Sequence, residues 1–201
     1  MGIAVCIVLL LGAASAALLS HPEWFVYKGK DDAPTTMYSD TVQSFSFYEP
    51  DYDLNVEEDE YYMGLDRYIH IQRGGENIAV TDGDFAAWGA PIEFFHRYFT
   101  AAIYADVETY NSLFTEKYYL TAKPYEFFAP QRIFGITVEQ LSAENTAAGT
   151  KYVYNVTYAI HKNDGTFRND IDSDAFKTLI FTLVPDGDTL KIDAIDYYRQ
   201  K

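Results

Sequence analysis

The sequence contains almost no cysteine. Its single cysteine, Cys6, lies in an apolar stretch at the start of the chain, so the remaining residues cannot form a disulfide framework. Stability must therefore come from the burial of side chains, and 18 Tyr and 14 Phe residues supply large surfaces to bury. The 201 residues suffice for one domain and a flexible segment, rather than for two domains.

Basic residues are also scarce. The chain carries 15 Lys and Arg residues against 30 Asp and Glu residues, a formal net charge of -15, and it has no basic cluster. Proteins that bind nucleic acid need clustered Lys and Arg side chains to replace the counterions of the phosphates, so nucleic acid is excluded as a partner. The acidic excess lies mainly in the first half, where residues 21–90 hold 15 acidic and 4 basic side chains.

Charge is absent from residues 2–19, which are all apolar or small. In a helix such a segment would extend about 27 Å, close to the thickness of a bilayer core. We expect residues 1–20 to be a signal anchor or, given the small residues Ala14-Ser15-Ala16, a cleaved signal peptide. The membrane is then a partner through this N-terminal helix, and the rest of the chain is extracytoplasmic on the cell membrane, or secreted. No basic residue precedes the run, which favours a true start further upstream.

Residues 21–65 are predicted to be an acidic stalk. They show no sustained apolar period, contain three prolines and include the acidic run 57–60. Acidic and amide side chains at residues 51–55 match the first ligands of a calcium-binding EF-hand loop. However, Val56 stands where that loop requires glycine, so we assign no metal there.

Residues 66–90 are predicted to form a short hairpin. Two segments rich in β-forming residues, 68–72 and 78–81, flank Gly74 and Gly75, which tolerate the positive φ angles of a tight turn. This strand pair would precede the main domain at 91–201.

Two helices are expected at the start of that domain. Pro91 suits the first turn of a helix, and Asp106 suits the N-cap of a second helix after a tight corner. The first helix carries an apolar stripe at helical spacing, formed by Ile92, Phe95, Phe99 and Ile103. Both helices should pack on one common surface.

After Pro130 the apolar period changes from helical to alternating. Four segments alternate between apolar and mainly polar residues, at 136–138, 152–160, 179–183 and 190–194. Turn residues separate them at 163–166 and 185–188. The predicted fold is therefore α+β, with helices packed on a curved antiparallel sheet.

The segment from Ala90 to Arg199 resembles the nuclear transport factor 2-like superfamily, a cone-shaped fold that includes scytalone dehydratase, ketosteroid isomerase and SnoaL-like polyketide cyclases. The resemblance rests on the helix 91–99, the corner 105–114 and the final hairpin that ends at 190–198. It implies a fold and no activity. The layout of apolar leader, acidic stalk and such a domain is also similar to surface proteins of Gram-positive bacteria.

Enzymes of this superfamily hold an acidic or histidine pair inside the cone, where burial adjusts its pKa. The inward-facing strand positions here carry mostly Tyr, Val, Ile, Phe and Leu, so we expect no acid or base inside and assign no catalytic residue. Tyrosines bring an apolar ring and a hydroxyl group to a pocket or an interface, although core packing is the better single explanation of them. The candidate pocket residues are His96, Tyr98, Tyr110, Tyr154 and Tyr158.

Asp170, Asp172 and Asp174 alternate along the chain and could place their oxygens on one side of an extended loop, as calcium prefers. A solvated loop explains the same pattern, because no turn glycine and no closing glutamate follow. We therefore assign no metal and no cofactor.

These observations favour a non-catalytic extracytoplasmic binding or protein-interaction module that is tethered to the membrane and able to form a homodimer or to bind a protein partner. One alternative is a SnoaL-like small-molecule isomerase, dehydratase or cyclase. Another is a structural spacer in a cell-envelope assembly. A deep cavity with an unpaired acid or histidine at its base would favour the enzyme.

Overall fold

The computed structural model describes residues 35–38, 44–81, 83 and 85–198. The predicted N-terminal helix and the first part of the predicted stalk lie outside these residues. By internal contacts the chain divides into Met1–Ala33 and Pro34–Lys201, and all the described residues belong to the second unit. Among the described residues, no helix combines the length and the apolar composition that spanning a bilayer requires.

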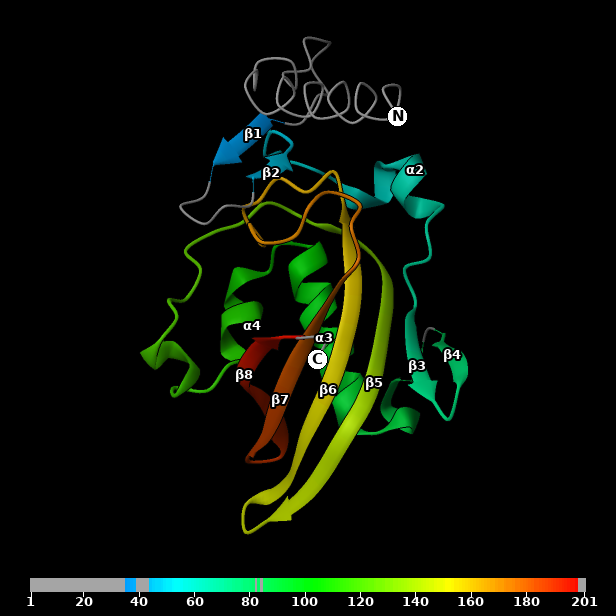
Figure 1. The fold of residues 1–201 in the computed structure, drawn as a ribbon, viewed down its shortest axis with the longest axis vertical. Helices are drawn as coiled ribbons and strands as arrows, with labels where there is room; N and C mark the ends of the chain where they lie inside the picture. Colours follow the sequence, from blue (N-terminus) through cyan, green and yellow to red (C-terminus); the bar gives the residue numbers. More distant parts are fainter. Residues whose placement is uncertain (1–34, 39–43, 82, 84, 199–201) are drawn as a thin grey trace, which may run out of the picture. The chain divides into compact units, whose positions relative to one another are not determined.

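The described part is an α+β fold built on a six-stranded sheet (Figure 1). The strand order is β4-β3-β5-β6-β7-β8. The strands are β3 (Ile69–Arg73), β4 (Glu76–Val80), β5 (Arg132–Thr146), β6 (Gly149–His161), β7 (Lys177–Asp186) and β8 (Thr189–Tyr197). A separate two-stranded sheet pairs β1 (Thr35–Tyr38) with β2 (Ser44–Phe47). The predicted α+β class and the antiparallel order of the last four strands are confirmed.

The six-stranded sheet is mixed, which corrects the prediction of a purely antiparallel sheet. The hairpin of β3 and β4 forms around Gly74 and Gly75 as expected, with φ angles of 61° and 86°. β3 then pairs in parallel with β5, with Ile69 opposite Ile136. Parallel neighbours need a long crossover, and the helices between β4 and β5 provide it. Side-chain alternation within a strand does not encode the direction of its neighbour, so the sequence pattern could not reveal this pairing.

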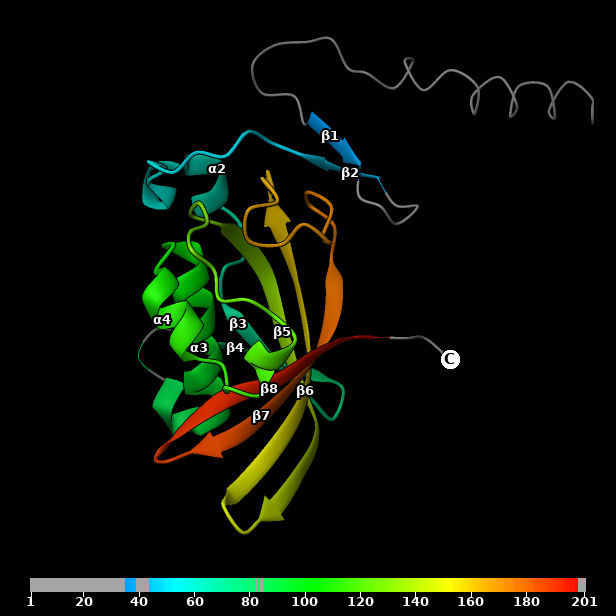
Figure 2. The ribbon, with the colours of Figure 1, turned by 90° about the vertical axis from the view of Figure 1, so that its left-hand side faces the viewer.

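Two helices cover one face of the sheet (Figures 1 and 2). α3 (Ala90–Ile103) has Pro91 in its first turn, and α4 (Val107–Ser112) is capped by Asp106. The Asp106 carboxylate accepts a hydrogen bond from the backbone N–H of Thr109 at 3.0 Å. Both predicted helices and their tight corner are thus confirmed.

The core lies between the two helices and the inner face of the sheet. Phe181 is at its centre, with an exposed fraction of 0%, and its ring meets those of Phe95 and Tyr98 edge-on at 5.8 and 5.3 Å. Aromatic pairs in this geometry contribute beyond the area they bury. The buried strand residues around it include Ile133, Ile136, Val138, Val156, Leu179, Leu183 and Ile192.

Part of the predicted stalk packs against this core. Val56 and Tyr62 are buried in a short 3₁₀ turn (Val56–Glu58) and in α2 (Glu60–Met63). The Tyr62 hydroxyl donates a hydrogen bond of 2.9 Å to the carbonyl of Ile133. The packed part of the described chain therefore includes residues upstream of residue 66, which the acidic composition of this segment did not indicate.

Candidate functional site

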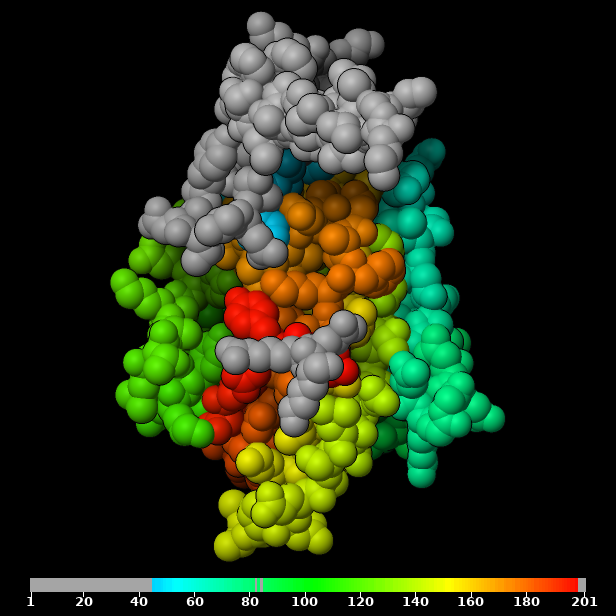
Figure 3. All heavy atoms as spheres, in the orientation of Figure 1, coloured from blue at the N-terminus to red at the C-terminus, as the bar shows by residue number. Residues whose placement is uncertain are grey.

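A cavity of about 270 Å³ opens between the segment after α4, the loop after β6 and the end of β8. In Figure 3 these three segments, coloured green, orange and red, meet on one face of the molecule. The volume lies just below the range of pockets that hold drug-sized ligands. Aromatic side chains form one large part of the lining, namely Tyr110, Phe114, Tyr118, Tyr119, Tyr125, Phe167 and Tyr197. Polar and charged side chains form another, namely Asn111, Lys123, Arg168, Asn169, Asp170 and Asp196.

The edge of the sheet positions the first wall. Phe114 forms a parallel bridge with Ile192 of β8, and backbone hydrogen bonds join Ile192 to Leu113 at 2.8 Å and to Thr115 at 3.0 Å. This short extension of the sheet fixes the chain just before Tyr118 and Tyr119. Their rings therefore lie beside the cavity.

Asn111 of α4 holds the opposite end of the same wall. Its amide group donates to the carbonyl of Tyr125 at 2.8 Å and its side-chain oxygen accepts from the N–H of Tyr125 at 3.0 Å. The Tyr119 hydroxyl donates to the backbone carbonyl of Asn111 at 2.8 Å. Asn111 thus fixes the segment that carries both tyrosines, through its side chain at Tyr125 and its backbone carbonyl at Tyr119.

The loop after β6 is organised by a buried asparagine, Asn163. Its amide group donates to the carbonyls of Arg168 at 2.9 Å and Ile171 at 2.6 Å, and its side-chain oxygen accepts from the N–H of Gly165 at 3.0 Å. The Tyr125 hydroxyl donates to the carbonyl of Phe167 in the same loop. These bonds fix the backbone on both sides of Arg168.

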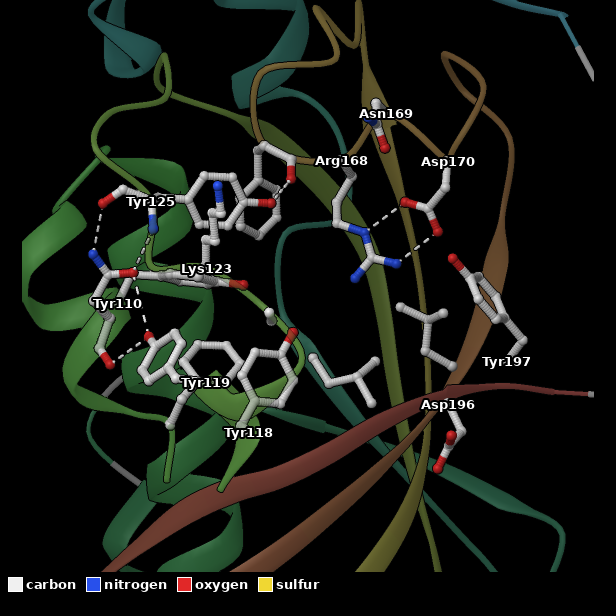
Figure 4. A pocket seen from close by; sticks show the side chains of 16 residues that line it. Tyr110, Tyr118, Tyr119, Lys123, Tyr125, Arg168, Asn169, Asp170, Asp196 and Tyr197 are labelled. Atoms are coloured by element: carbon white, nitrogen blue, oxygen red, sulfur yellow. Dashed lines mark hydrogen bonds and ion pairs between the residues drawn. The ribbon is translucent and has the colours of Figure 1, made fainter. Parts of the chain in front are cut away.

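Arg168 and Asp170 form a bidentate ion pair at the wall of the cavity (Figure 4). The Nε and Nη2 groups of Arg168 each donate to one carboxylate oxygen of Asp170, both at 2.7 Å. The Nζ of Lys177 donates to the same carboxylate at 2.9 Å. The exposed fractions of the Arg168 and Asp170 side chains are 13% and 21%. Two cations therefore share one carboxylate in a largely dehydrated place.

The charges of this group are fixed across the ordinary pH range. Burial alone would raise the pKa of the Asp170 carboxyl, but the hydrogen bonds and charges of Arg168 and Lys177 outweigh it and hold that pKa well below its usual value. Burial alone would lower the pKa of Arg168, yet nearby Tyr158 and Asp170 keep it above its usual value. Burial also raises the pKa of Tyr125 and of Tyr119 to about 12. The cavity thus presents neutral phenols and a permanent ion pair.

Three buried tyrosines lie together, with Tyr110 in the wall of the cavity and Tyr98 and Tyr158 behind it. The hydroxyl groups of Tyr98 and Tyr110 are 3.4 Å apart. The fully buried hydroxyl of Tyr158 lies near Tyr98 and Arg168 but makes no hydrogen bond of ordinary geometry to the described residues. Burial raises the pKa values of all three phenols, so they remain protonated.

Of the five residues predicted to line a pocket, only Tyr110 lines this cavity. Tyr98 and Tyr158 lie behind it in the core, and the Tyr154 hydroxyl donates to Gln140 at 3.0 Å. His96 stacks on Phe85 with ring centroids 3.8 Å apart and lines a different cavity of about 240 Å³. The structure therefore does not bring the five residues together.

Sequence reasoning missed the ion pair, and its expectation of an interior without charged groups does not hold at this wall. Arg168 and Asp170 stand two residues apart between the apolar residues Phe167 and Ile171, both of which are buried. The signal that the sequence offered was an arginine and an aspartate two residues apart between two apolar residues, a pattern that is compatible with an ion pair drawn into the interior. The alternation of Asp170, Asp172 and Asp174 had drawn attention to a metal instead.

These three acidic side chains have different partners. Asp170 pairs with Arg168, Asp172 accepts a hydrogen bond from the N–H of Ser46 at 3.3 Å, and Asp174 meets His161 at 2.7 Å. Within the described ranges no group of three or more His, Cys, Asp or Glu side chains is arranged to hold a metal ion.

Comparison with protein-family profiles, curated proteins and solved structures finds no match for this chain.

Proposed function

We propose that this chain is a non-catalytic binding module, whose cavity beside Arg168 takes a small molecule. The main observation behind this proposal is that the protein fixes the cavity from two sides. Asn111 fixes its aromatic wall, Asn163 fixes the loop after β6, and that loop holds the ion pair of Arg168 and Asp170. Ligand sites are typically apolar and aromatic clefts with a few fixed polar groups. This cavity shares the aromatic wall and the fixed polar groups, and further polar side chains such as Lys123, Asn169 and Asp196 also line it.

The same geometry is unfavourable for acid–base catalysis. A general acid or base works best when its pKa lies near the working pH. Two carboxyl groups line the cavity, and Asp170, the one held within its wall, has a pKa far below that range because two cations neutralise it. None of the histidines in the described ranges lines this cavity. The SnoaL-like enzyme therefore has less support than binding.

Filling the cavity should abolish binding. Ala122 is half-buried in the cavity wall, so the Ala122→Phe side chain should occupy part of the space a ligand needs. A mixed library of neutral, anionic and cationic fragments would be screened against the full chain by ligand-detected NMR. We expect at least one class of fragment to bind the wild type and to lose binding in this variant.

The matched control is Ala143→Phe, because Ala143 is exposed in the second half of β5 and does not line the cavity. It should bind the same fragments as the wild type. A wild-type chain that binds no fragment, or a cavity-filled variant that binds them all unchanged, would contradict the proposed function.

We also propose that the domain is a variant of the nuclear transport factor 2-like cone held outside the cytoplasm by residues 1–20. The support for the cone is the order of α3, the corner at Asp106 and the long antiparallel strands β5 to β8. The support for the tether is the uncharged run 2–19. Pairing with a second copy or with a protein partner, and a spacer role, remain predictions from the sequence.

The tether has a direct test. In cells that produce the full chain, alkaline carbonate washing should leave it in the membrane fraction, or the chain should appear in the medium if the leader is cleaved. Deletion of residues 2–19 should move it to the cytosol. A chain that is cytosolic with these residues present would disprove the tether.

A further inference from the structure

One edge of the Arg168 guanidinium is not used by the protein. A guanidinium carries five N–H donors in a planar fork. Nε and Nη2 donate to Asp170, whereas Nη1 makes no hydrogen bond to the described residues. In Figure 4 this remaining nitrogen points away from Asp170, toward the side of the cavity that carries the tyrosines. The free edge presents donors in the geometry that fits a second carboxylate.

The charge balance around the cavity also leaves one positive charge. Arg168 and Lys177 together face the single carboxylate of Asp170. Lys123 and Asp196 also line the cavity, and their formal charges cancel although no ion pair joins these two side chains. A local excess of one positive charge stands out in a chain with a net charge of -15. Because Arg168 is largely buried, this charge is weakly screened by salt and by the distant acidic residues.

The aromatic walls define the rest of the ligand. The rings of Phe114 and Tyr118 pack on one another with centroids 4.5 Å apart, and those of Tyr110 and Phe167 with centroids 5.2 Å apart, so they form a fixed aromatic wall beside the cavity. A flat ligand ring would pack against this wall. The Tyr119 and Tyr125 hydroxyls already donate to backbone carbonyls, whereas the Tyr118 hydroxyl makes no hydrogen bond to the described residues and can donate to an anion. The volume of about 270 Å³ limits the ligand to roughly one ring with a short substituent.

We infer that the ligand of this cavity is a small aromatic carboxylate, whose carboxyl group receives hydrogen bonds from the free edge of Arg168 and whose ring packs against Phe114, Tyr118 and Tyr119. This inference rests on the proposed function, since it names the class of ligand for the same cavity. Lys177 supports it from behind by sharing Asp170, which leaves the Arg168 charge incompletely neutralised.

The test compares probes of one shape and different charge. Benzoate and phenylacetate are titrated against the full chain by calorimetry or NMR, beside benzamide and phenylacetamide as neutral matches and benzylamine as the cation. We expect each carboxylate to bind at least about tenfold more tightly than its amide, and benzylamine to bind least. Inorganic phosphate should bind more weakly than benzoate, because it lacks the ring.

Two variants assign the preference to Arg168. Arg168→Gln should bring benzoate and benzamide to within about twofold of one another, whereas Arg73→Gln, at an exposed arginine of β3, should leave the tenfold difference unchanged. If Arg168→Gln does not fold, the double variant Arg168→Gln with Asp170→Asn removes both charges while retaining neutral side chains that can hydrogen-bond. It should show the same loss of preference.

The outcomes separate the two proposals. If the amides or benzylamine bind in the cavity as well as the carboxylates do, the inference fails and the proposed function stands. If a carboxylate preference persists without Arg168, the assignment to this residue is wrong. If no probe or library fragment binds the wild type, both fail.

Discussion

The Asp170→Ala variant should lose about 3 kcal/mol of unfolding free energy at neutral pH, because it leaves the largely buried charge of Arg168 without its carboxylate. Breaking a buried ion pair by removing one partner costs about 3–5 kcal/mol, and the partial exposure of both side chains places this one at the lower end. Urea unfolding followed by circular dichroism measures the difference. In the same variant the cavity should bind carboxylates differently, since Arg168 gains a free edge.

The effect should depend on pH in one direction. The pKa of Asp170 is lower in the folded chain than its usual value of about 3.9, so the pair stabilises the folded state above that value. This contribution begins to fall as the pH drops below about 4, because the unfolded carboxyl takes up a proton there while the folded one stays ionised, and it is fully lost only when the pH has also fallen below the lower folded pKa. The difference between the wild type and Asp170→Ala should therefore be constant from pH 5 to 8 and should shrink at lower pH.

Asp186→Ala is the matched control, because Asp186 also pairs with a lysine, Lys191, at 2.8 Å but has an exposed fraction of 54%. Exposed pairs contribute under about 1 kcal/mol. A loss for Asp170→Ala as small as that for Asp186→Ala would mean that the Arg168 charge is not held in a dehydrated place.

Phe181→Ala is the second large change. This ring is fully buried between the helices and the sheet and meets Phe95 and Tyr98, so its removal should lower the unfolding free energy by about 3–5 kcal/mol. Small domains have about 5–15 kcal/mol in total, so the variant should be close to unfolded at physiological temperature. The urea midpoint and the melting temperature measure the loss.

Phe176→Ala serves as its control, since Phe176 has an exposed fraction of 60% although it lies just before the same strand. It should lose under about 1 kcal/mol. Equal losses for the two phenylalanines would contradict the position of the core between α3 and the sheet.

Local patterns predicted the individual elements well. Pro91 and the apolar stripe of the first helix identified α3, Asp106 identified the start of α4, and the alternation of Tyr154, Val156 and Tyr158 identified the buried face of β6. These signals are local, since they depend only on residues a few positions apart. The parallel neighbour of β5 depends on a contact across more than sixty residues, which alternation does not encode.

The site was harder to predict than the fold. The strand tyrosines were natural candidates, but Tyr154 and Tyr158 belong to the core, and most of the cavity wall comes from the irregular segments around Tyr118, Tyr125 and Arg168. The conformation of those segments depends on side-chain to backbone bonds such as those of Asn111 and Asn163. Such bonds have no periodic signature in a sequence.

The most direct test of the ligand site is an NMR titration of the full chain with benzoate. We predict intermolecular nuclear Overhauser effects between the benzoate ring and the rings of Tyr118 and Tyr119, together with a shift of the Nε–H signal of Arg168. Contacts located instead at the second cavity, beside His96, or no saturable shift at all, would contradict the account.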